Sequence, residues 1–170
     1  GDLLVWIDAG SHIKPCVGSR VRDYYSRLIN SDADIMTFQI KHTEAAWSKR
    51  DTIEEVIRRY PDDAYQQLSR YIYQFTSQVF IIKKTESSLR LAREWHEIAI
   101  EKDLHFSNDN KSTSGPEAKE FIDHRHDQSI FSLMCKLGPA NIIVNSDNFS
   151  DDPTSDSMVF QPRRWRTTKE

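Results

Sequence analysis

A cluster of ionisable side chains lies in the stretch 123–129, whose sequence is Asp-His-Arg-His-Asp-Gln-Ser. Two carboxylates, two imidazoles and one guanidinium precede a run of apolar residues. Ionisable groups this close together shift one another's pKa values, and such shifts are common in functional sites. We therefore predict that His124, Arg125, His126 and Asp127 contribute to a functional site. A simpler interpretation is that Asp127 caps a helix and that both histidines are surface residues.

A further carboxylate, Asp8, directly follows the apolar run 3–7 and is followed by Ala9 and Gly10. A carboxylate just past a buried strand can bind a divalent cation or a sugar hydroxyl. Gly10, which has no side chain, would let a ligand approach the backbone closely. An ordinary turn explains the same residues, because Asp and Gly are both common in turns.

Aromatic and amide side chains form two more candidates. Glu44 and Trp47 lie just before a predicted helix. An aromatic face can pack against a sugar ring while a carboxylate binds its hydroxyls. The alternative is that Trp47 packs as a hydrophobic staple and that Lys49 lies in a solvated first turn. The segment 74–78 begins and ends with Gln, and the amide of Gln78 can form paired hydrogen bonds to hydroxyls.

The spacing of apolar residues predicts that strands and helices alternate. Strands are predicted at 3–7, 34–40, 78–82 and 141–144. Helices are predicted at 20–30, 48–60, 62–71, 85–102 and 127–137, with a short one starting at residue 116. The first strand is a continuous apolar run, typical of a strand covered on both faces. The polar segment 103–116 is expected to be a loop.

This alternation is typical of an α/β fold with a mixed sheet flanked by helices. Ligands of such folds bind beyond the carboxyl ends of strands, which is where Asp8 is expected. Ser48 and Asp51 are spaced as a variant of the capping box, so they are expected to form the start of the helix predicted at 48–60.

Composition limits the classes of function. The chain has 170 residues, enough for one domain, and 38% of them are hydrophobic. A net charge of -3 argues against a nucleic-acid partner, because such domains usually carry a basic face. Two cysteines without a CxxC motif favour a reducing compartment, and we expect a cytoplasmic location. No apolar run approaches the ~20 residues of a membrane span, so none is expected.

Taken together, these segments resemble the GT-A-type, nucleotide-sugar-dependent glycosyltransferases found in capsule and surface-glycan clusters and in large viruses. The resemblance rests on four features in the same order. They are the Asp-Ala-Gly strand end at 8–10, the Glu-x-x-Trp-x-Lys segment at 44–49, a strand with Gln78, and the His-x-His-Asp-Gln-Ser helix start at 124–129.

The resemblance implies a nucleotide-diphospho-sugar transferase fold that apparently lacks its N-terminal, nucleotide-binding βαβ part. Residues 1–145 would then be the sugar and acceptor part of the catalytic domain, followed by a polar extension at 146–170. The partners it implies are a nucleotide sugar and a glycan acceptor. The reaction would move the sugar to a hydroxyl of a glycan or glycoconjugate.

The resemblance also implies roles for individual residues. Asp127 would be the base in an inverting enzyme, or would flank the anomeric carbon with Gln128 in a retaining one, and Glu44 is a further catalytic candidate. The expected substrate-binding residues are Asp8, Ala9, Gly10, Trp47, Lys49, Gln78, His124, Arg125 and His126. Asp8 occupies the first position of an Asp-x-Asp metal motif, so Mn²⁺ or Mg²⁺ is a possible cofactor. The third position is Gly10, which leaves that motif incomplete.

Two other classes of function stay open at this point. One is a non-catalytic subunit that binds carbohydrate or assists assembly, which suits the incomplete metal motif. The other is a metal-dependent hydrolase that uses His124, His126 and Asp127, although further ligands for such a metal are not visible.

Overall fold

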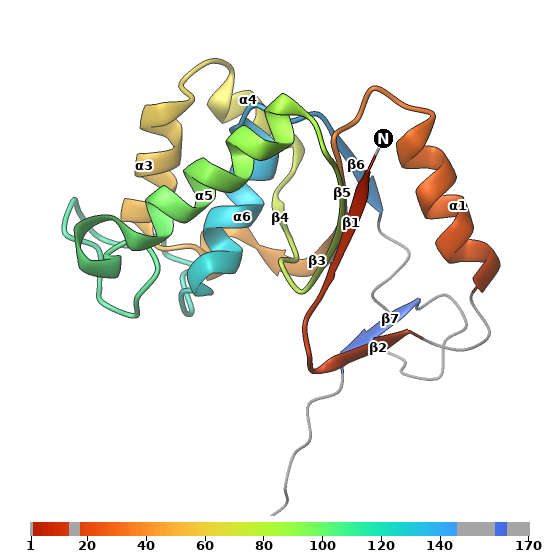
Figure 1. The fold of residues 1–170 in the computed structure, drawn as a ribbon. Helices are drawn as coiled ribbons and strands as arrows, with labels where there is room; N and C mark the ends of the chain where they lie inside the picture. The colour runs from red at the N-terminus through yellow and green to blue at the C-terminus, as the bar shows by residue number, and fades with distance from the viewer. Residues whose placement is uncertain (1, 14–17, 146–158, 163–170) are drawn as a thin grey trace, which may run out of the picture.

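The computed structural model describes residues 2–13, 18–145 and 159–162. Within these ranges the chain has an α/β fold, with a mixed sheet flanked by helices (Figure 1). The elements in chain order are β1 (Leu3–Ile7), β2 (Ser11–Ile13), α1 (Gly18–Ile29), β3 (Ile35–Thr43), α2 (Glu44–Trp47), α3 (Arg50–Arg59), α4 (Ala64–Arg70), β4 (Tyr73–Phe75), β5 (Val79–Lys83), α5 (Glu86–Leu104), α6 (His126–Leu137), β6 (Ile142–Asn145) and β7 (Phe160–Pro162).

The main sheet is built around β3. Its strands are ordered β1-β5-β3-β4, and β6 also pairs with β3. β5 runs antiparallel to both β1 and β3, whereas β6 is parallel to β3. It follows that β1, β3 and β6 run in one direction and that their carboxyl ends face the same edge of the sheet. Strands β2 and β7 form a separate antiparallel pair.

Each face of the sheet is covered by helices (Figure 1). On one face, α1 packs Tyr24 and Leu28 against Phe38 of β3, in the same apolar cluster as Phe160 of β7. On the other face, α3, α5 and α6 pack around Ile35 of β3. Strand β3 is therefore buried on both sides, as expected for the middle strand of such a sheet.

Strand β1 differs from the sequence prediction. The prediction of a strand covered on both faces is wrong, because one face of β1 is exposed. β1 also pairs with β5 alone among the strands that the structure describes. Its burial alternates, with Leu4 55% and Trp6 49% exposed. Asp8 therefore follows an edge strand.

The predicted starts of two helices are also wrong. Helix α3 begins at Arg50, and its N-cap residue, Lys49, makes no side-chain capping bond. Helix α6 begins one residue before Asp127, so the N-cap position belongs to Arg125, again without a side-chain capping bond. Both carboxylates that were expected to support these helix starts, those of Asp51 and Asp127, are thus available for other contacts.

Two segments predicted from composition turn out differently. Residues 105–125 contain no regular secondary structure, so the short helix predicted at Pro116 is absent. Much of the predicted polar extension, 146–158 and 163–170, lies outside the described residues. The described part of that extension is 159–162, where Val159 and Phe160 are buried in the core on the α1 side of the sheet.

Candidate functional site

A line of hydrogen bonds joins the end of β1 to the start of α6. The Asp8 amide donates to the Gln78 carbonyl at 2.8 Å, and the Gln78 amide donates to the Thr76 hydroxyl at 3.1 Å. That hydroxyl in turn donates to the Gln128 side-chain oxygen at 3.4 Å. The Asp-Ala-Gly segment and the Asp-Gln pair, which lie far apart in the sequence, are therefore held at one edge of the sheet.

Asp127 presents its carboxylate to solvent at this edge. The side chain is exposed and makes no hydrogen bond or ion pair with any residue that the structure describes. The backbone is fixed, because the indole of Trp95 donates to the Asp127 carbonyl at 3.1 Å. A firmly held main chain with an unpartnered carboxylate is an arrangement that can accept a proton from a ligand.

The ring of Trp47 contacts two other side chains near the start of α6. The Trp47 and His42 ring centroids lie 4.7 Å apart, and the Arg125 guanidinium carbon lies 5.7 Å from the Trp47 ring centroid. The Trp47 carbonyl also accepts from the Arg125 amide and from the Ser129 hydroxyl. An aromatic ring and a cation, both half-buried, are thereby attached to the first turn of α6.

Glu44 has a structural environment and does not fit the predicted catalytic role. The residue is 7% exposed, and its carboxylate accepts from the Lys136 ammonium and the Ser132 hydroxyl on α6. The second carboxylate oxygen accepts from the Ser48 hydroxyl at 2.6 Å and the Gln74 amide at 3.3 Å. Because both oxygens are engaged inside the protein, Glu44 joins α2 to α6 and β4.

Gln74, the first residue of the candidate segment 74–78, supplies the buried amide of this region. It is fully buried, whereas the predicted Gln78 contributes its backbone to the line described above. The Gln74 side-chain nitrogen donates to the Ser48 hydroxyl at 2.9 Å, and its oxygen accepts from the Gln128 amide at 3.0 Å. Gln128, itself 5% exposed, is therefore held by the protein and positions the backbone next to Asp127.

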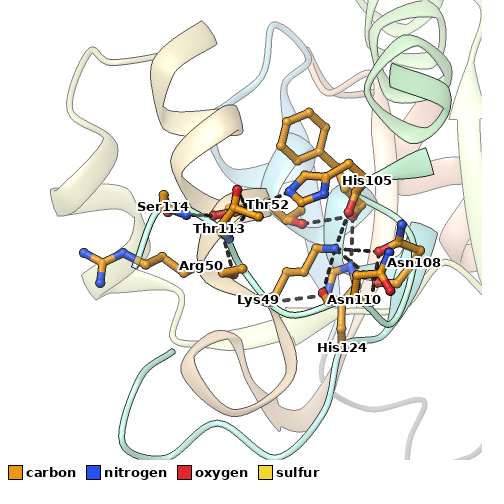
Figure 2. Close-up of polar contacts among 12 residues, drawn as sticks. Lys49, Arg50, Thr52, His105, Asn108, Asn110, Thr113, Ser114 and His124 are labelled. Atoms are coloured by element: carbon orange, nitrogen blue, oxygen red, sulfur yellow. Dashed lines mark hydrogen bonds and ion pairs between the residues drawn. The ribbon is translucent and has the colours of Figure 1, made fainter. Parts of the chain in front are cut away.

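Lys49 is buried, with only 1% of the residue exposed. Its ammonium donates to the backbone carbonyls of His105, Asn108 and Asn110 and to the Asn108 side-chain oxygen (Figure 2). Burial lowers the pKa of the ammonium, while the nearby Asp51 carboxylate opposes that shift. In place of the predicted substrate contact, Lys49 therefore holds the segment after α5.

The two predicted histidines have different surroundings. His124 is buried; its Nδ1 accepts from the Lys49 amide at 3.2 Å and its Nε2 donates to the Phe106 carbonyl at 2.9 Å. Burial lowers the pKa of His124 to about 4, so the ring is neutral at pH 7. His126 is exposed, and its Nδ1 donates to the Ser107 carbonyl at 3.0 Å. Only the second imidazole can therefore reach a ligand.

Asp51 is the most heavily bonded carboxylate that the sequence analysis did not assign to the site. It accepts from His105 Nε2 at 2.6 Å, from the Thr113 amide at 2.7 Å and hydroxyl at 3.0 Å, and from the Ser114 amide at 3.0 Å. Burial alone would raise the pKa of Asp51, but these hydrogen bonds hold it well below its usual value. Asp51 is therefore ionised at neutral pH.

A shallow pocket of about 420 Å³ lies beside this carboxylate. It is lined by Asp51, Glu54, Glu55, Arg58, Lys102, His105, Phe106, Thr113 and Ser114. None of the residues predicted to bind substrate lines it. The pocket and the edge that carries Asp8 and Asp127 are thus built from different residues.

The described side chains do not assemble a metal site. No three His, Cys, Asp or Glu residues within 2–13, 18–145 and 159–162 are grouped as ligands. Both ring nitrogens of His124 are used inside the protein, which also removes one of the three ligands that a metal-dependent hydrolase would need.

Over the part of the chain described here, no helix combines the length and apolar character needed to cross a membrane.

Comparison of the chain with protein-family models, with curated proteins and with solved structures finds no match. Function must therefore be inferred from the side chains that this fold brings together.

Proposed function

We propose that this protein is a glycosyltransferase that moves a sugar from a nucleotide-sugar donor to a hydroxyl of a glycan or glycoconjugate. The observation that carries the proposal is the exposed carboxylate of Asp127, which has no partner among the residues that the structure describes. It lies next to Gln128, which the hydrogen-bond line connects to Asp8 at the carboxyl end of β1. Two segments that carry the resemblance to GT-A enzymes are thus neighbours in space.

The sheet supports a GT-A-like fold as part of this proposal. An antiparallel strand, β5, lies between β1 and β3, which run parallel to each other. Ligands of such sheets bind at the carboxyl ends of the parallel strands, where Asp8 is found.

In the proposed reaction, Asp127 acts as general base. The acceptor hydroxyl oxygen attacks the anomeric carbon, the bond from that carbon to the diphosphate oxygen breaks, and the diphosphate leaves with the electron pair. The proton of the hydroxyl passes to the Asp127 carboxylate, and a positioned base of this kind contributes typically ~10²–10⁴-fold. Arg125, two residues before Asp127 in the chain, supplies positive charge, and such charge stabilises a departing diphosphate.

The test is a screen of nucleotide sugars for transfer and hydrolysis, followed by an Asp127→Asn variant. We expect at least a ~100-fold loss of sugar transfer, because Asn cannot accept the proton. The melting temperature should change little, since the carboxylate has no partner to lose among the residues with a described structure. Asp62→Asn, an exposed carboxylate between α3 and α4, is the matched control and should keep full activity.

Two results would contradict the proposal. A parent protein that neither binds nor turns over any nucleotide sugar excludes the transferase function. Transfer within a few-fold of the parent in the Asn variant excludes Asp127 as the base.

A non-catalytic carbohydrate-binding protein is the second candidate, favoured by the aromatic ring of Trp47 beside Arg125. An aromatic face and a nearby polar group are the usual features of sites that bind sugar rings. Glycan binding that needs no nucleotide sugar, and that is lost in Trp47→Ala but kept in Asp127→Asn, would support this candidate over the transferase.

A further inference from the structure

The irregular segment 105–117 is wrapped around the first turn of α3. The Lys49 ammonium binds oxygens of the first part of the segment, at His105, Asn108 and Asn110 (Figure 2). Asp51, two residues further on, binds the later part through the amides of Thr113 and Ser114 and also binds the His105 ring. Two buried, oppositely charged side chains thus hold the segment at several points.

The bonds of Lys49 are unusual for a buried cation. Its ammonium has no carboxylate within ion-pair distance among the described residues, and every acceptor that it binds is a carbonyl or amide oxygen. Burying a charge is costly unless its hydrogen bonds are made. Here the oxygens of the 105–110 backbone compensate Lys49, so the ammonium and that backbone conformation depend on each other.

The same segment holds both histidines at the start of α6. The Phe106 carbonyl accepts from His124 Nε2, and the Ser107 carbonyl accepts from His126 Nδ1. Lys49 also contacts His124 directly, because its backbone amide donates to the Nδ1 atom. A displacement of the segment would therefore move the imidazole of His126, the residue before Asp127 in the chain.

Backbone strain indicates that this conformation is imposed by tertiary contacts. His126 has a φ of 50°, and Lys102, Asp103 and Leu104 have φ values of 50°, 56° and 66°. Left-handed conformations cost non-glycine residues about 1 kcal/mol or more each, so they persist only where surrounding contacts require them. Both ends of the irregular stretch between α5 and α6 are therefore held away from their preferred geometry.

We propose that Lys49 and Asp51 are positioning residues that fix His126 and Asp127 through the 105–117 segment, an inference that rests on the transferase function proposed above. They touch neither donor nor acceptor. Their task is to keep the His126 imidazole, and with it the start of α6 next to Asp127, in one geometry, and misplacement of a reacting group by about 1 Å can cost 10²-fold in rate.

The main test compares Asp51→Asn with the parent protein by histidine NMR and by kinetics. Asn keeps the size of Asp but cannot accept all four hydrogen bonds. We expect the imidazole resonances of His126 and His124 to shift in the ligand-free variant. We expect kcat for transfer to fall by about 10-fold or more, as for other residues that orient a catalytic group, with the donor KM changed less than about twofold. Arg58→Gln, an exposed residue of the same helix, should match the parent in both measurements.

A second pair of variants, which removes fewer hydrogen bonds, tests the proposal if Asp51→Asn does not fold. Asn108→Ala removes one acceptor of the Lys49 ammonium and the bond to the Asn110 amide, whereas Asn108→Asp keeps both oxygen contacts. We expect the Ala variant to behave like Asp51→Asn and the Asp variant to recover the parent spectrum and rate.

Unchanged imidazole resonances in a folded Asp51→Asn or Asn108→Ala protein would overturn the proposal, as would a fall in rate that appears only in the donor KM. The spectra need no substrate. A parent without transferase activity would therefore exclude the proposed function, while the NMR comparison would still decide whether Lys49 and Asp51 position His126.

Discussion

Glu44 and Lys136 form a buried ion pair that joins the short helix α2 to α6. The side chain of Lys136 is fully buried and that of Glu44 is 9% exposed. Burial lowers the pKa of Lys136, and the charge of Glu44 opposes that shift. The pair is connected to the proposed site through Gln74, which donates to the Glu44 carboxylate and accepts from the Gln128 amide.

Breaking this pair should be strongly destabilising. Glu44→Gln and Lys136→Met each leave one buried charge without its partner, which costs about 3–5 kcal/mol of unfolding free energy. The double variant removes both charges and should recover a large part of that loss. Urea unfolding of the three proteins measures these differences, and a double variant as unstable as the sum of the two single variants would contradict the pairing.

The unfolding free energy should depend on pH through His124. The folded-state pKa of about 4 lies below the ordinary value of 6.5, so between these values only the unfolded chain binds the proton. The unfolding free energy should therefore fall as the pH falls through this window, by up to about 3 kcal/mol. Asp51, whose pKa is also lowered, loses its contribution only as the pH falls below its ordinary value of 3.8.

His124→Gln tests this dependence by urea unfolding between pH 4 and 7. The variant should lose the dependence within the window, while His96→Gln, on the exposed face of α5, should keep it. An unchanged profile in His124→Gln would assign the dependence to other groups.

Thr85 should contribute to the start of α5 in two ways. Its hydroxyl accepts from the Ser88 amide in a capping box, and donates to the buried Asp34 carboxylate at 2.7 Å. Thr85→Ala should lower the unfolding free energy by about 1 kcal/mol through loss of the cap. Loss of the bond to a charged group should lower it by a further amount of about 1–3 kcal/mol. Thr85→Ser keeps the hydroxyl and should stay close to the parent in thermal and urea unfolding.

Two glycines should respond differently to the same substitution. A Cβ at Gly138 would lie 2.4 Å from the Met134 carbonyl oxygen, so the helix end would have to move, at a cost of about 1–3 kcal/mol. At Gly115 the nearest atom, at 2.9 Å, is the end of the flexible Arg50 side chain. Gly115→Ala should therefore change the unfolding free energy by less than about 0.5 kcal/mol. Equal effects at both positions would contradict this geometry.

The sequence predicted those elements whose apolar residues repeat with a regular period. Helices α1, α5 and α6 and strands β3 and β5 were found in this way, because one face of each helix and both faces of β3 enter a core. The conformation of 105–125 was not predictable from local patterns. It is set by bonds to Lys49 and Asp51, which lie more than 50 residues earlier in the chain.

The sequence indicates only part of the candidate site, because many of its contacts join residues that lie far apart in the chain. The α/β pattern predicted that Asp8 follows the carboxyl end of its strand, and Asp8 does follow β1. Its connection to Gln128 depends on hydrogen bonds through Gln78 and Thr76, which no local pattern indicates. The sequence around Glu44 does not show whether its carboxylate is exposed or buried. Its partners Ser132 and Lys136 lie 88 and 92 residues later in the chain. Sequence spacing alone does not show which carboxylates find such partners.

Strand β1 has a consequence for the behaviour of this chain in solution. Its outer edge has no described strand partner, and Leu4 and Trp6 leave apolar surface beside it. An uncovered edge of this kind is a template on which a second chain can add a strand, which leads to self-association and aggregation. We expect the chain, studied alone, to form larger species at high concentration. Leu4→Lys, which places a charge on that edge, should suppress them in light scattering.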